Sequence, residues 1–387
     1  MTQLDQALAY LDQCREEMLF LWETLVRMES PSADPEAIDR LASHLDTYCR
    51  ALGMETEKFR PEGAGTCLAA TPARALPPIL LLGHMDTVHP VGSFPGGPFT
   101  RRDGCVYGPG VHDCKGGLVM ALYVIRALQH IGYDRRQLRL ALVSDEETGH
   151  SLSQMASVEF LERHAQGCGA AFTFESGLLN GDIVTGRKGG GVIRLTVEGI
   201  ASHCGTAPEK GASAVREAAR KVVAIQALSD PAHTTFNCGI IHGGTSANVV
   251  PDRCEVSVAL RFHTNRDRDE ALSALQSICG RVETPGTQCT LSPLAGFPAM
   301  EETDRTAALF ALYRETSTAL GLGTPESVYS AGCSDSAYTT ALGIPTLCAV
   351  GVLGQGQHSP DEHAFADSLL PQAKRLAAAI LALPDDF

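Results

Sequence analysis

The amino-acid sequence predicts an α/β protein, in which a mostly parallel sheet covered by helices is interrupted by a smaller inserted α+β unit. Strand-like apolar runs alternate with helical stretches in both outer parts of the chain, which is typical of a parallel sheet. From about Gly189 to Pro298 the pattern changes to strict alternation of apolar and polar residues. The length of 387 residues also exceeds what one hydrophobic core normally serves.

The first part of the chain supplies most of the predicted parallel sheet. Helical spacing of apolar residues predicts a helix over 4–28, and a second helix opens at Pro35 and closes at Gly53. The apolar run 79–82 indicates a buried strand, followed by a long loop over 87–112. The sequence KGGLVMALYVIRALQHIG predicts a further helix, and LRLALVS and AAFTFES predict further strands.

The inserted unit is predicted to be a small α+β sandwich. The sequences GVIRLTVEG and CEVSVALRFH alternate like half-buried antiparallel strands, and helices are expected over 211–228 and 267–282. The resulting order β-α-β-β-α-β is that of a ferredoxin-like sandwich with one open sheet face. We therefore expect an inserted domain over 188–298.

The last part of the chain returns to the first domain. A helix resumes at Ala307, IPTLCAVGV predicts a strand, and a closing helix is expected over 366–382. The main domain is thus expected to combine residues 1–187 and 299–387.

Composition excludes several classes of function. A formal net charge of −14 argues against a nucleic-acid partner or a membrane-surface protein. The 13 cysteines contain no CxxC pair, which argues against a zinc ribbon and a secreted disulfide framework. The N-terminal sequence lacks the pattern of a signal peptide, and no apolar run has the length of a membrane span. A cytoplasmic protein is expected.

Polar residues able to bind a metal follow several of the predicted strands. His84 and Asp86 come after the first buried run, and residues i and i+2 of an extended chain face the same side. The other candidates end later strands or lie in the loops that follow: Asp113, Glu146, Glu147, Glu175 and His358. In a parallel sheet such strand ends share one edge, where ligands gather. Two histidines and three carboxylates suit a pair of metals such as zinc.

Each of these residues also has an ordinary structural explanation. An aspartate in a glycine-rich turn, as at Asp113, usually caps the turn, and adjacent glutamates are usually a solvated face. His358 taken alone is more often a structural residue than a metal ligand. Glu175 is harder to explain in this way, because a carboxylate at the end of a buried run needs a partner. Their joint occurrence at successive strand ends favours the metal site.

The ordered motifs resemble a known family of co-catalytic di-zinc hydrolases. The motifs are GHMDTVHP, YGPGVHDCKGG, SDEETG, ASHCGTAPEKGASAV, GGTSANVVPD and HSPDEH, and they span nearly the whole chain. The family includes carboxypeptidase G-type glutamate carboxypeptidases, aminoacylases, acetylornithine deacetylase and succinyl-diaminopimelate desuccinylase, and the carboxypeptidase G branch is the most similar. The resemblance implies a catalytic domain of the di-zinc exopeptidase type with an inserted lid and dimerisation domain.

The resemblance also implies a role for each metal ligand. His84 is expected to bind one zinc ion together with Glu175, and Glu147 and His358 are expected to hold the second. Asp113 is expected to bridge the two ions. Co²⁺ and Mn²⁺ are possible substitutes for zinc.

The same resemblance assigns the catalytic groups. Glu146 is expected to act as the general base on a metal-bridging water, and Asp86 to orient His84. Because consecutive strand residues face opposite ways, the backbone is expected to turn between Glu146 and Glu147, near Gly149. His203 is expected to stabilise the oxyanion in the active site of a partner subunit.

Substrate recognition is assigned to the inserted domain. Arg261 lies on the polar face of CEVSVALRFH, and the resemblance implies that it binds the carboxylate of the substrate, with Asn248 nearby. The expected substrate is a small molecule or dipeptide-like compound with a carboxylate, from which a C-terminal amino acid or an N-acyl group is removed. A homodimer formed through the inserted domain is expected.

Some positions depart from the family pattern. Cys114 stands where many relatives carry an acidic residue, and His112 precedes the expected bridging aspartate. His89 and His363 add two more histidines near the expected site, and Lys188 lies in a glycine-rich junction that reads as a hinge or a substrate contact.

Other enzyme classes fit the sequence less well. GCSDS lacks the last glycine of a GxSxG motif, having Ser336 there, and Cys204 beside His203 leaves the carboxylates unexplained. Neither a P-loop nor a dinucleotide fingerprint is present. Two alternatives remain: an N-acyl amino acid deacylase of the acetylornithine or succinyl-diaminopimelate type, and a non-catalytic, metal-dependent binding protein on the same scaffold. An intact Glu146 favours an enzyme.

Overall fold

The computed structural model describes residues 1–72, 78–385 and 387, which divide into two compact units. The larger unit comprises Met1–Gly186, Glu301–Ser330 and Ser334–Phe387, and the smaller comprises Arg187–Met300 with Ala331–Cys333. Each unit has its own core of buried apolar side chains. In the described part of the chain, no helix is both long and apolar enough to cross a membrane.

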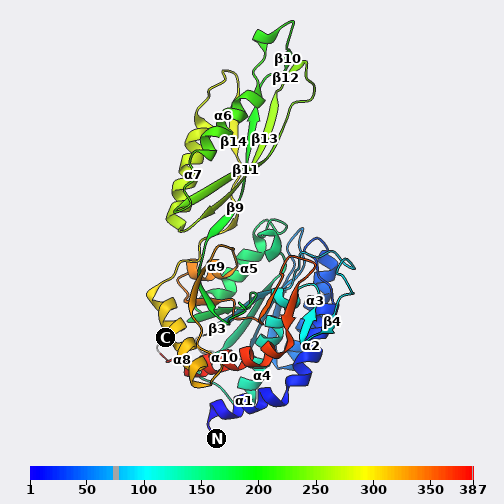
Figure 1. The fold of residues 1–387 in the computed structure, drawn as a ribbon, viewed down its shortest axis with the longest axis vertical. Helices are drawn as coiled ribbons and strands as arrows, with labels where there is room; N and C mark the ends of the chain where they lie inside the picture. Colours follow the sequence, from blue (N-terminus) through cyan, green and yellow to red (C-terminus); the bar gives the residue numbers. More distant parts are fainter. Residues whose placement is uncertain (73–77, 386) are drawn as a thin grey trace. The chain divides into compact units, whose positions relative to one another are not determined.

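The larger unit is built from helices around a main sheet (Figure 1). Its helices are α1 (Gln3–Gln13), α2 (Arg15–Arg27), α3 (Pro35–Ala51), α4 (Gly116–His130), α5 (Ala156–Ala165), α8 (Asp304–Ala319), α9 (Ser336–Ala341) and α10 (Leu369–Ala382). Its main sheet contains, in spatial order, β1 (Met54–Phe59), β2 (Cys67–Pro72), β6 (Leu138–Val143), β3 (Ile79–His84), β7 (Ala170–Thr173), β17 (Thr346–Cys348), β8 (Ile183–Arg187) and β16 (Ser327–Ser330).

The centre of this sheet is parallel, which confirms the predicted α/β class. Strands β6, β3, β7 and β17 pair in parallel, whereas β1, β2 and β8 pair antiparallel at the margins. Every residue of β3 is buried, as expected of a strand covered on both faces. Helices α1, α4 and α10 pack against one another, and α3 and α5 pack against β1, β2 and β6.

Two predicted segments of the larger unit differ from the structure. The helix expected over 4–28 is divided at Cys14 into α1 and α2. The expected loop over 87–112 contains a hairpin, β4 (Thr100–Arg102) and β5 (Cys105–Tyr107). Its turn is Asp103–Gly104, both with positive φ, and an Asp-Gly pair is a strong hairpin signal that the sequence contains. Strands β19 (His363–Phe365) and β18 (Gly354–Gln355) complete this second sheet.

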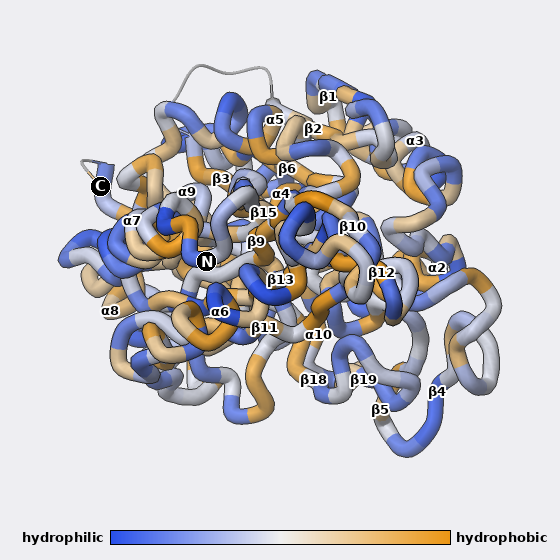
Figure 2. The backbone as a smooth tube through the Cα atoms, turned by 90° about the horizontal axis from the view of Figure 1, so that it is seen from above, coloured by the Kyte–Doolittle hydropathy of each residue, from blue (hydrophilic) through white to orange (hydrophobic). Residues whose placement is uncertain are grey.

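The smaller unit has the predicted order β-α-β-β-α-β. Its elements are β9 (Gly189–Glu198), α6 (Ala214–Gln226), β11 (Thr234–Gly243), β13 (Arg253–Phe262), α7 (Asn265–Gly280) and β14 (Gln288–Leu291), with β15 (Ala295–Phe297) beside β9 and a separate pair of β10 (Ser202–His203) and β12 (Val249–Val250). The sheet order is β11-β13-β9-β14, and α6 and α7 pack together against it (Figure 1). Figure 2 shows hydrophilic and hydrophobic residues alternating along α6, as expected of a half-buried helix.

Capping residues explain where the helices of the smaller unit begin. The Ser213 side chain accepts a hydrogen bond from the Arg216 N–H, so α6 begins at Ala214 and not at 211. Thr264 forms a capping box with Asp267 at the start of α7. The two ends of the insert are also paired, because Arg187 and Met300 exchange backbone hydrogen bonds of 3.0 and 3.1 Å.

A buried ion pair holds the chain between α7 and β14. Glu217 and Lys221, one helical turn apart on α6, are each about 1% exposed and lie 2.9 Å apart. Glu217 also accepts hydrogen bonds from the backbone N–H groups of Glu283 and Thr284, and Lys221 donates to the Arg281 carbonyl. Burial alone would raise the pKa of Glu217, but these bonds outweigh it and hold that pKa below its usual value.

We expect Glu217→Ala to reduce the free energy of unfolding by about 3–5 kcal/mol, because Lys221 is left buried without its charge partner. The matched control is Glu270→Ala, which removes an exposed i,i+4 pair with Arg266 on α7 and should change stability by less than about 0.5 kcal/mol. Urea unfolding followed by circular dichroism measures both. The two variants losing equal stability would contradict the role of the buried pair. Because the pKa of Glu217 is depressed, its contribution is lost as the pH falls through that pKa.

Candidate metal centre

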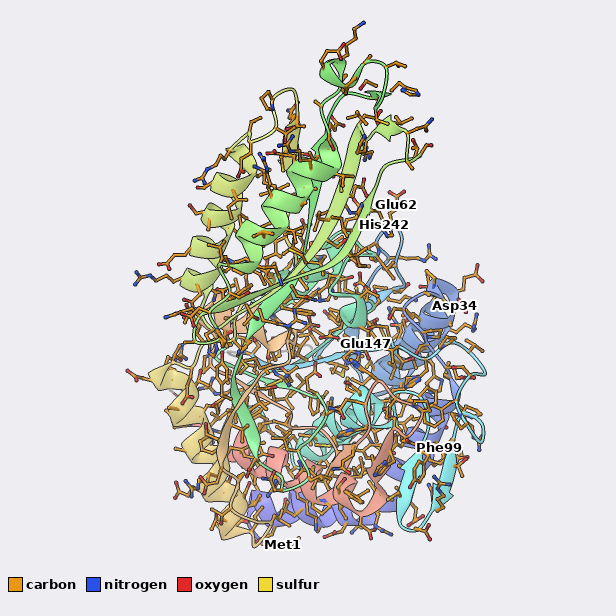
Figure 3. The ribbon with its side chains drawn as sticks, turned by 45° about the horizontal axis from the view of Figure 1, so that its top comes forward. Met1, Asp34, Glu62, Phe99, Glu147 and His242 are labelled. Atoms are coloured by element: carbon orange, nitrogen blue, oxygen red, sulfur yellow. The ribbon has the colours of Figure 1, made fainter. Side chains whose placement is uncertain are left out.

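Three of the predicted ligands meet in the larger unit. One ligand atom from each of His84, Asp113 and Glu147 lies within 4.8 Å of the others. His84 ends β3, Asp113 lies in the turn Val111–Lys115 before α4, and Glu147 lies in a 3₁₀ turn after β6. Figure 3 labels Glu147 among the loops of this unit. The strand ends of the parallel sheet therefore converge as expected.

The Asp113 carboxylate lies between two imidazoles. Its Oδ1 is 3.2 Å from Nε2 of His84, and its Oδ2 is 3.4 Å from Nε2 of His358. The same His358 nitrogen is 2.8 Å from Oε2 of Glu147. Each oxygen of the Asp113 carboxylate thus faces a different imidazole nitrogen.

The charges of this group depend on one another. Burial alone would raise the pKa of Asp113, but hydrogen bonds from His358 and His84 hold it well below its usual range. The hydrogen bonds of His358 to Asp113 and Glu147 raise the pKa of His358 to about 10. Burial raises the pKa of Glu147 to about 7, against the opposing effect of His358. Imidazole and carboxylate donors crowded into a space of low polarity fit a divalent cation such as zinc, which can replace the protons.

Glu146 is separated from its neighbour by a turn. Residues Glu146–Thr148 form a 3₁₀ turn ended by Gly149, whose φ is +61°, so the two glutamates need not face opposite ways as they would in a strand. Glu146 is 9% exposed. Burial and the negative charge of Glu175 raise its pKa well above the usual value. A carboxyl group with a raised pKa is suited to accepting and returning a proton.

Glu175 and His358 lie outside the tightest group of three. Glu175 follows β7, is buried, and accepts a hydrogen bond of 3.0 Å from Oγ of Ser334. After burial, the negative charge of Glu175 is a further cause of the raised pKa of both Glu146 and Cys114. His358 contacts two members of the cluster but is itself exposed.

Asp86 contacts His84 and also supports a neighbouring turn of the site. Nδ1 of His84 lies 3.0 Å from the backbone oxygen of Asp86 and 3.5 Å from its carboxylate. The carboxylate also accepts hydrogen bonds from the N–H groups of Glu146 and Glu147, at 3.2 and 3.1 Å, and from the Ser32 hydroxyl at 2.7 Å. Asp86 thereby fixes the turn that carries both glutamates.

Sequence reasoning missed Glu362 as a supporting residue. This side chain is 1% exposed and accepts hydrogen bonds from the N–H groups of Gly110, His112 and Asp113, at 3.1, 2.9 and 3.1 Å. Nε2 of His89 lies 3.2 Å from the same carboxylate. The sequence signal for this role is the acidic residue within HSPDEH. The partners of Glu362 lie about 250 positions away in the chain, so they were not apparent from the sequence.

The other histidines near the site have partners of their own. Nε2 of His112 lies 3.1 Å from the Gly177 carbonyl, and His363 stacks on Tyr107. Cys114 contacts the backbone of His84 through its sulfur, at 3.4 Å. None of these three positions belongs to the group of metal-binding atoms found in the described residues.

Three predicted site residues belong to the smaller unit. His203 is exposed and its Nδ1 accepts hydrogen bonds from Gly205 and Thr206. Asn248 is close to His203, since its backbone oxygen accepts a hydrogen bond from the N–H of Cys204. Arg261 lies on β13 with an exposed side chain. Their roles at the metal centre stay predictions.

One cavity of the larger unit adjoins the cluster. It has a volume of about 540 Å³ and is bounded by Glu147 and by apolar side chains that include Pro31, Val88 and Leu152. A second cavity, of about 930 Å³, is lined by none of the cluster residues but by His112 and by the segment Gly354–Gln357, which was expected to shape the substrate pocket. Both have the size of sites that bind small molecules.

We expect metal binding to the metal-free protein to weaken as the pH falls. His84 and His358 both have raised pKa values next to Asp113, so each holds a proton that a metal must displace. Calorimetric titration with Zn²⁺ in buffers of different ionisation enthalpy measures the protons released. Binding without net proton release would contradict this charge assignment.

We expect Asp86→Asn to lower metal affinity by about 10- to 100-fold, because an amide cannot accept from both N–H groups of the turn and from Ser32 without turning a donor toward one of them. Asp367→Asn, at an exposed ion pair with Arg15, is the matched control and should bind metal normally. Competition with a chromophoric chelator gives both affinities, and equal values would show that the hydrogen bonds of Asp86 do not support the site.

Known proteins share both the sequence and the fold of this chain. Carboxypeptidase G2 of Pseudomonas sp. (strain RS-16) is 26% identical over 370 residues, which cover 93% of this chain and 87% of that protein. A succinyl-diaminopimelate desuccinylase of Xylella fastidiosa (strain 9a5c) is 29% identical over 361 residues, covering 86% and 90%. The crystal structure of the M20 family metallo-carboxypeptidase Sso-CP2 from Sulfolobus solfataricus has a TM-score of 0.76 at 18% identity, covering 94% and 98%.

The family profile gives the decisive match. Residues 80–382 match Peptidase family M20/M25/M40, and this range includes all of the predicted ligands. The chain is therefore a member of Peptidase family M20/M25/M40, a metal-dependent hydrolase of the peptidase and deacylase type.

Proposed function

We propose that this protein is a zinc-dependent hydrolase that cleaves an amide bond of a small carboxylate-bearing substrate, releasing a C-terminal amino acid or an N-acyl group. The observation that carries the proposal is the Asp113 carboxylate, held between His84 and His358 with Glu147 alongside and with the buried Glu146 adjacent in the same turn. The match to carboxypeptidase G2 supports the carboxypeptidase G-like form of the reaction.

The proposed centre holds two Zn²⁺ ions, with Co²⁺ or Mn²⁺ as substitutes. His84 and Glu175 would hold the first ion, Glu147 and His358 would hold the second, and Asp113 would be shared by both. The two opposite contacts of Asp113 support this division, as does the 2.8 Å contact between His358 and Glu147. Such a pair of ions supplies a Lewis acid that polarises the scissile carbonyl and lowers the pKa of a nucleophilic water to about 7.

The side chains of the protein move the protons. Glu146 takes a proton from the attacking water and returns it to the leaving amine, which its buried position and raised pKa support. Asp86 keeps Glu146 in place through its backbone N–H. His203, from the smaller unit of a partner subunit, donates a hydrogen bond to the developing oxyanion.

Groups of the smaller unit recognise the substrate. Arg261 binds the carboxylate of the substrate through its planar guanidinium, and Asn248 assists. The proposed assembly is a homodimer formed through this unit. Strand β11 lies at the edge of its sheet and exposes Ile240 and Ile241, which are 54% and 50% exposed. An exposed apolar edge strand of this kind favours pairing with a second chain.

A second candidate is an N-acyl amino acid deacylase of the acetylornithine or succinyl-diaminopimelate type. It is favoured by the 29% identity to a succinyl-diaminopimelate desuccinylase, over 86% of this chain. Activity of the zinc-loaded protein on acyl-glutamate, dipeptide, acyl-ornithine and succinyl-diaminopimelate substrates separates the two candidates. If the zinc-loaded protein hydrolysed none of these substrates, the result would instead support a non-catalytic binding protein.

We expect Glu146→Gln to lower kcat by about 10²- to 10⁴-fold, because glutamine cannot accept the proton of the water. Zinc content, measured by elemental analysis, should stay at the wild-type value, since Glu146 is not a proposed ligand. Glu159→Gln on the exposed side of α5 serves as the control and should keep full activity. A fully active Glu146→Gln enzyme would exclude Glu146 as the base.

We expect Arg261→Met to raise KM about 10- to 100-fold for substrates with a free carboxylate, because a hydrogen bond to a charged group contributes about 1.5–3 kcal/mol. When the free carboxylate of the substrate is replaced by a methyl amide, the variant and the wild type should hydrolyse it equally slowly. Steady-state kinetics on the pair of substrates makes the comparison, and an equal KM in both enzymes would remove Arg261 from substrate binding. Arg253→Met, at an exposed ion pair on the same strand, is the control.

A further inference from the structure

A buried histidine in the larger unit lies between two carboxylates that the proposed reaction does not use. His150 has no exposed surface. Its Nδ1 is 3.2 Å from Oδ1 of Asp145, and its Nε2 is 2.6 Å from Oδ1 of Asp335. Burial alone would lower the pKa of His150, but Asp335 and Asp145 raise it to about 10. The imidazole is thus placed to donate a hydrogen bond from each ring nitrogen, one to Asp145 and one to Asp335.

Asp145, His150 and Asp335 form a buried triad. Asp145, at one side of this triad, holds the loop that carries Glu146 and Glu147. Asp145 directly precedes Glu146, and its second oxygen accepts a hydrogen bond of 2.8 Å from the N–H of Ser153. The N–H of His150 donates to the Asp145 carbonyl, at 3.0 Å. Gly149 and His150 both have positive φ, at 61° and 58°, so the loop folds back tightly on Asp145.

The other side of the triad belongs to the loop that holds Glu175. Asp335 follows Ser334, whose hydroxyl donates to Oε1 of Glu175 at 3.0 Å. Ser334 and Asp335 are both buried, at 0% and 1% exposed. The chain of contacts thus runs from Glu146 and Glu147, through the triad, to Glu175. These glutamates come from different strands of the sheet.

We propose that His150 is a positioning residue that sets the spacing between the loop of Glu146 and Glu147 and the carboxylate of Glu175. The inference rests on the proposed function, because it concerns the ligands of that centre. His150 is itself neither a proposed ligand nor a catalytic group. Its imidazole joins the two loops through its contacts with Asp145 and Asp335, and so keeps the carboxylates at a fixed separation.

The test compares zinc binding with stability in His150→Gln, Asp335→Asn and the double variant. Zinc affinity is measured by chelator competition on the metal-free protein, and stability by thermal unfolding. We expect each single variant to lose about 10- to 100-fold in zinc affinity, as for other residues that support metal ligands. The double variant should bind zinc no more weakly than the single variant with the lower zinc affinity, because both substitutions break the same contact.

A matched control separates positioning from general destabilisation. Leu45→Ala makes a cavity in the core at α3, lowers the melting temperature, and should leave zinc affinity unchanged. If His150→Gln does not fold, Asp335→Asn alone decides. Wild-type zinc affinity in the variants, or an equal loss of affinity in Leu45→Ala, would overturn the inference. A wild-type protein that binds zinc but hydrolyses no substrate would instead overturn the proposed function.

A second inference concerns two cysteines of the smaller unit. The sulfurs of Cys279, near the end of α7, and Cys289, on β14, are 2.8 Å apart. A disulfide bond is about 2.05 Å long, so the two sulfurs need to approach each other by less than about 1 Å to form one. We propose that this pair is a site of oxidation by low-molecular-weight disulfides such as glutathione disulfide.

The reaction is two successive exchanges. The thiolate of Cys289, the more exposed of the two, attacks glutathione disulfide and releases one glutathione thiolate. The thiolate of Cys279 then attacks the Cys289 sulfur, forms the internal disulfide and releases the second glutathione. Two protein thiols lose two electrons and two protons, which the glutathione disulfide takes up. Burial raises the pKa of Cys289, so the first step is slow.

Peptide mapping tests this inference directly. Arg281 lies between the two cysteines, so trypsin places them on separate peptides. After treatment of the full chain with glutathione disulfide, we expect one cross-linked pair of peptides, which Cys279→Ser abolishes and replaces with a glutathione adduct on Cys289. The exposed Cys204 should carry an adduct in both proteins. Separate glutathione adducts on Cys279 and Cys289 of the wild-type protein would overturn the inference. So would unmodified thiols at both positions in a sample in which Cys204 is modified.

Discussion

A carboxylate removed from water stays charged only when cations or hydrogen-bond donors surround it, and this requirement governs the larger unit. Asp113 meets it with an imidazole on each oxygen. Those contacts explain why the depressed pKa of Asp113 and the raised pKa values of the two imidazoles occur together. Removing any one of the three groups leaves the others in an unfavourable state, so the cluster behaves as a unit.

A second set of buried carboxylates holds the backbone and not the metal. Asp86 accepts hydrogen bonds from the N–H groups of the turn that carries Glu146 and Glu147, and Glu362 accepts from three N–H groups of the segment that ends at Asp113. Fixing the backbone in this way fixes the side chains, because each rotamer starts from a defined Cα position. These buried carboxylates thus divide into those that belong to the candidate metal centre and those that hold the loops around it.

Sequence patterns predicted the parts of the fold that depend on local periodicity. The buried run of β3, the alternation of β13 and the order of elements in the smaller unit follow from hydrophobic spacing, and the structure has them. The hairpin of β4 and β5 was missed although Asp103–Gly104 signals it, because the surrounding strands are short and polar.

The candidate site could be predicted only as far as the motifs reached. The three residues that meet most closely, His84, Asp113 and Glu147, were identified from strand ends and motif order. The supporting contacts of Glu362 and His150 were not, because their partners lie far away in the chain and no periodicity relates them. Asp86 was identified, but its carboxylate contacts a neighbouring turn that only the folded chain brings within reach.

The paired backbone of Arg187 and Met300 has a consequence for how such proteins diversify. A segment whose two ends adjoin can be replaced by a short turn, or moved into another host, without pulling its surroundings apart. The insert is therefore a unit that can be exchanged as a whole. It can change in sequence or length without altering the sheet that carries the acidic and imidazole groups.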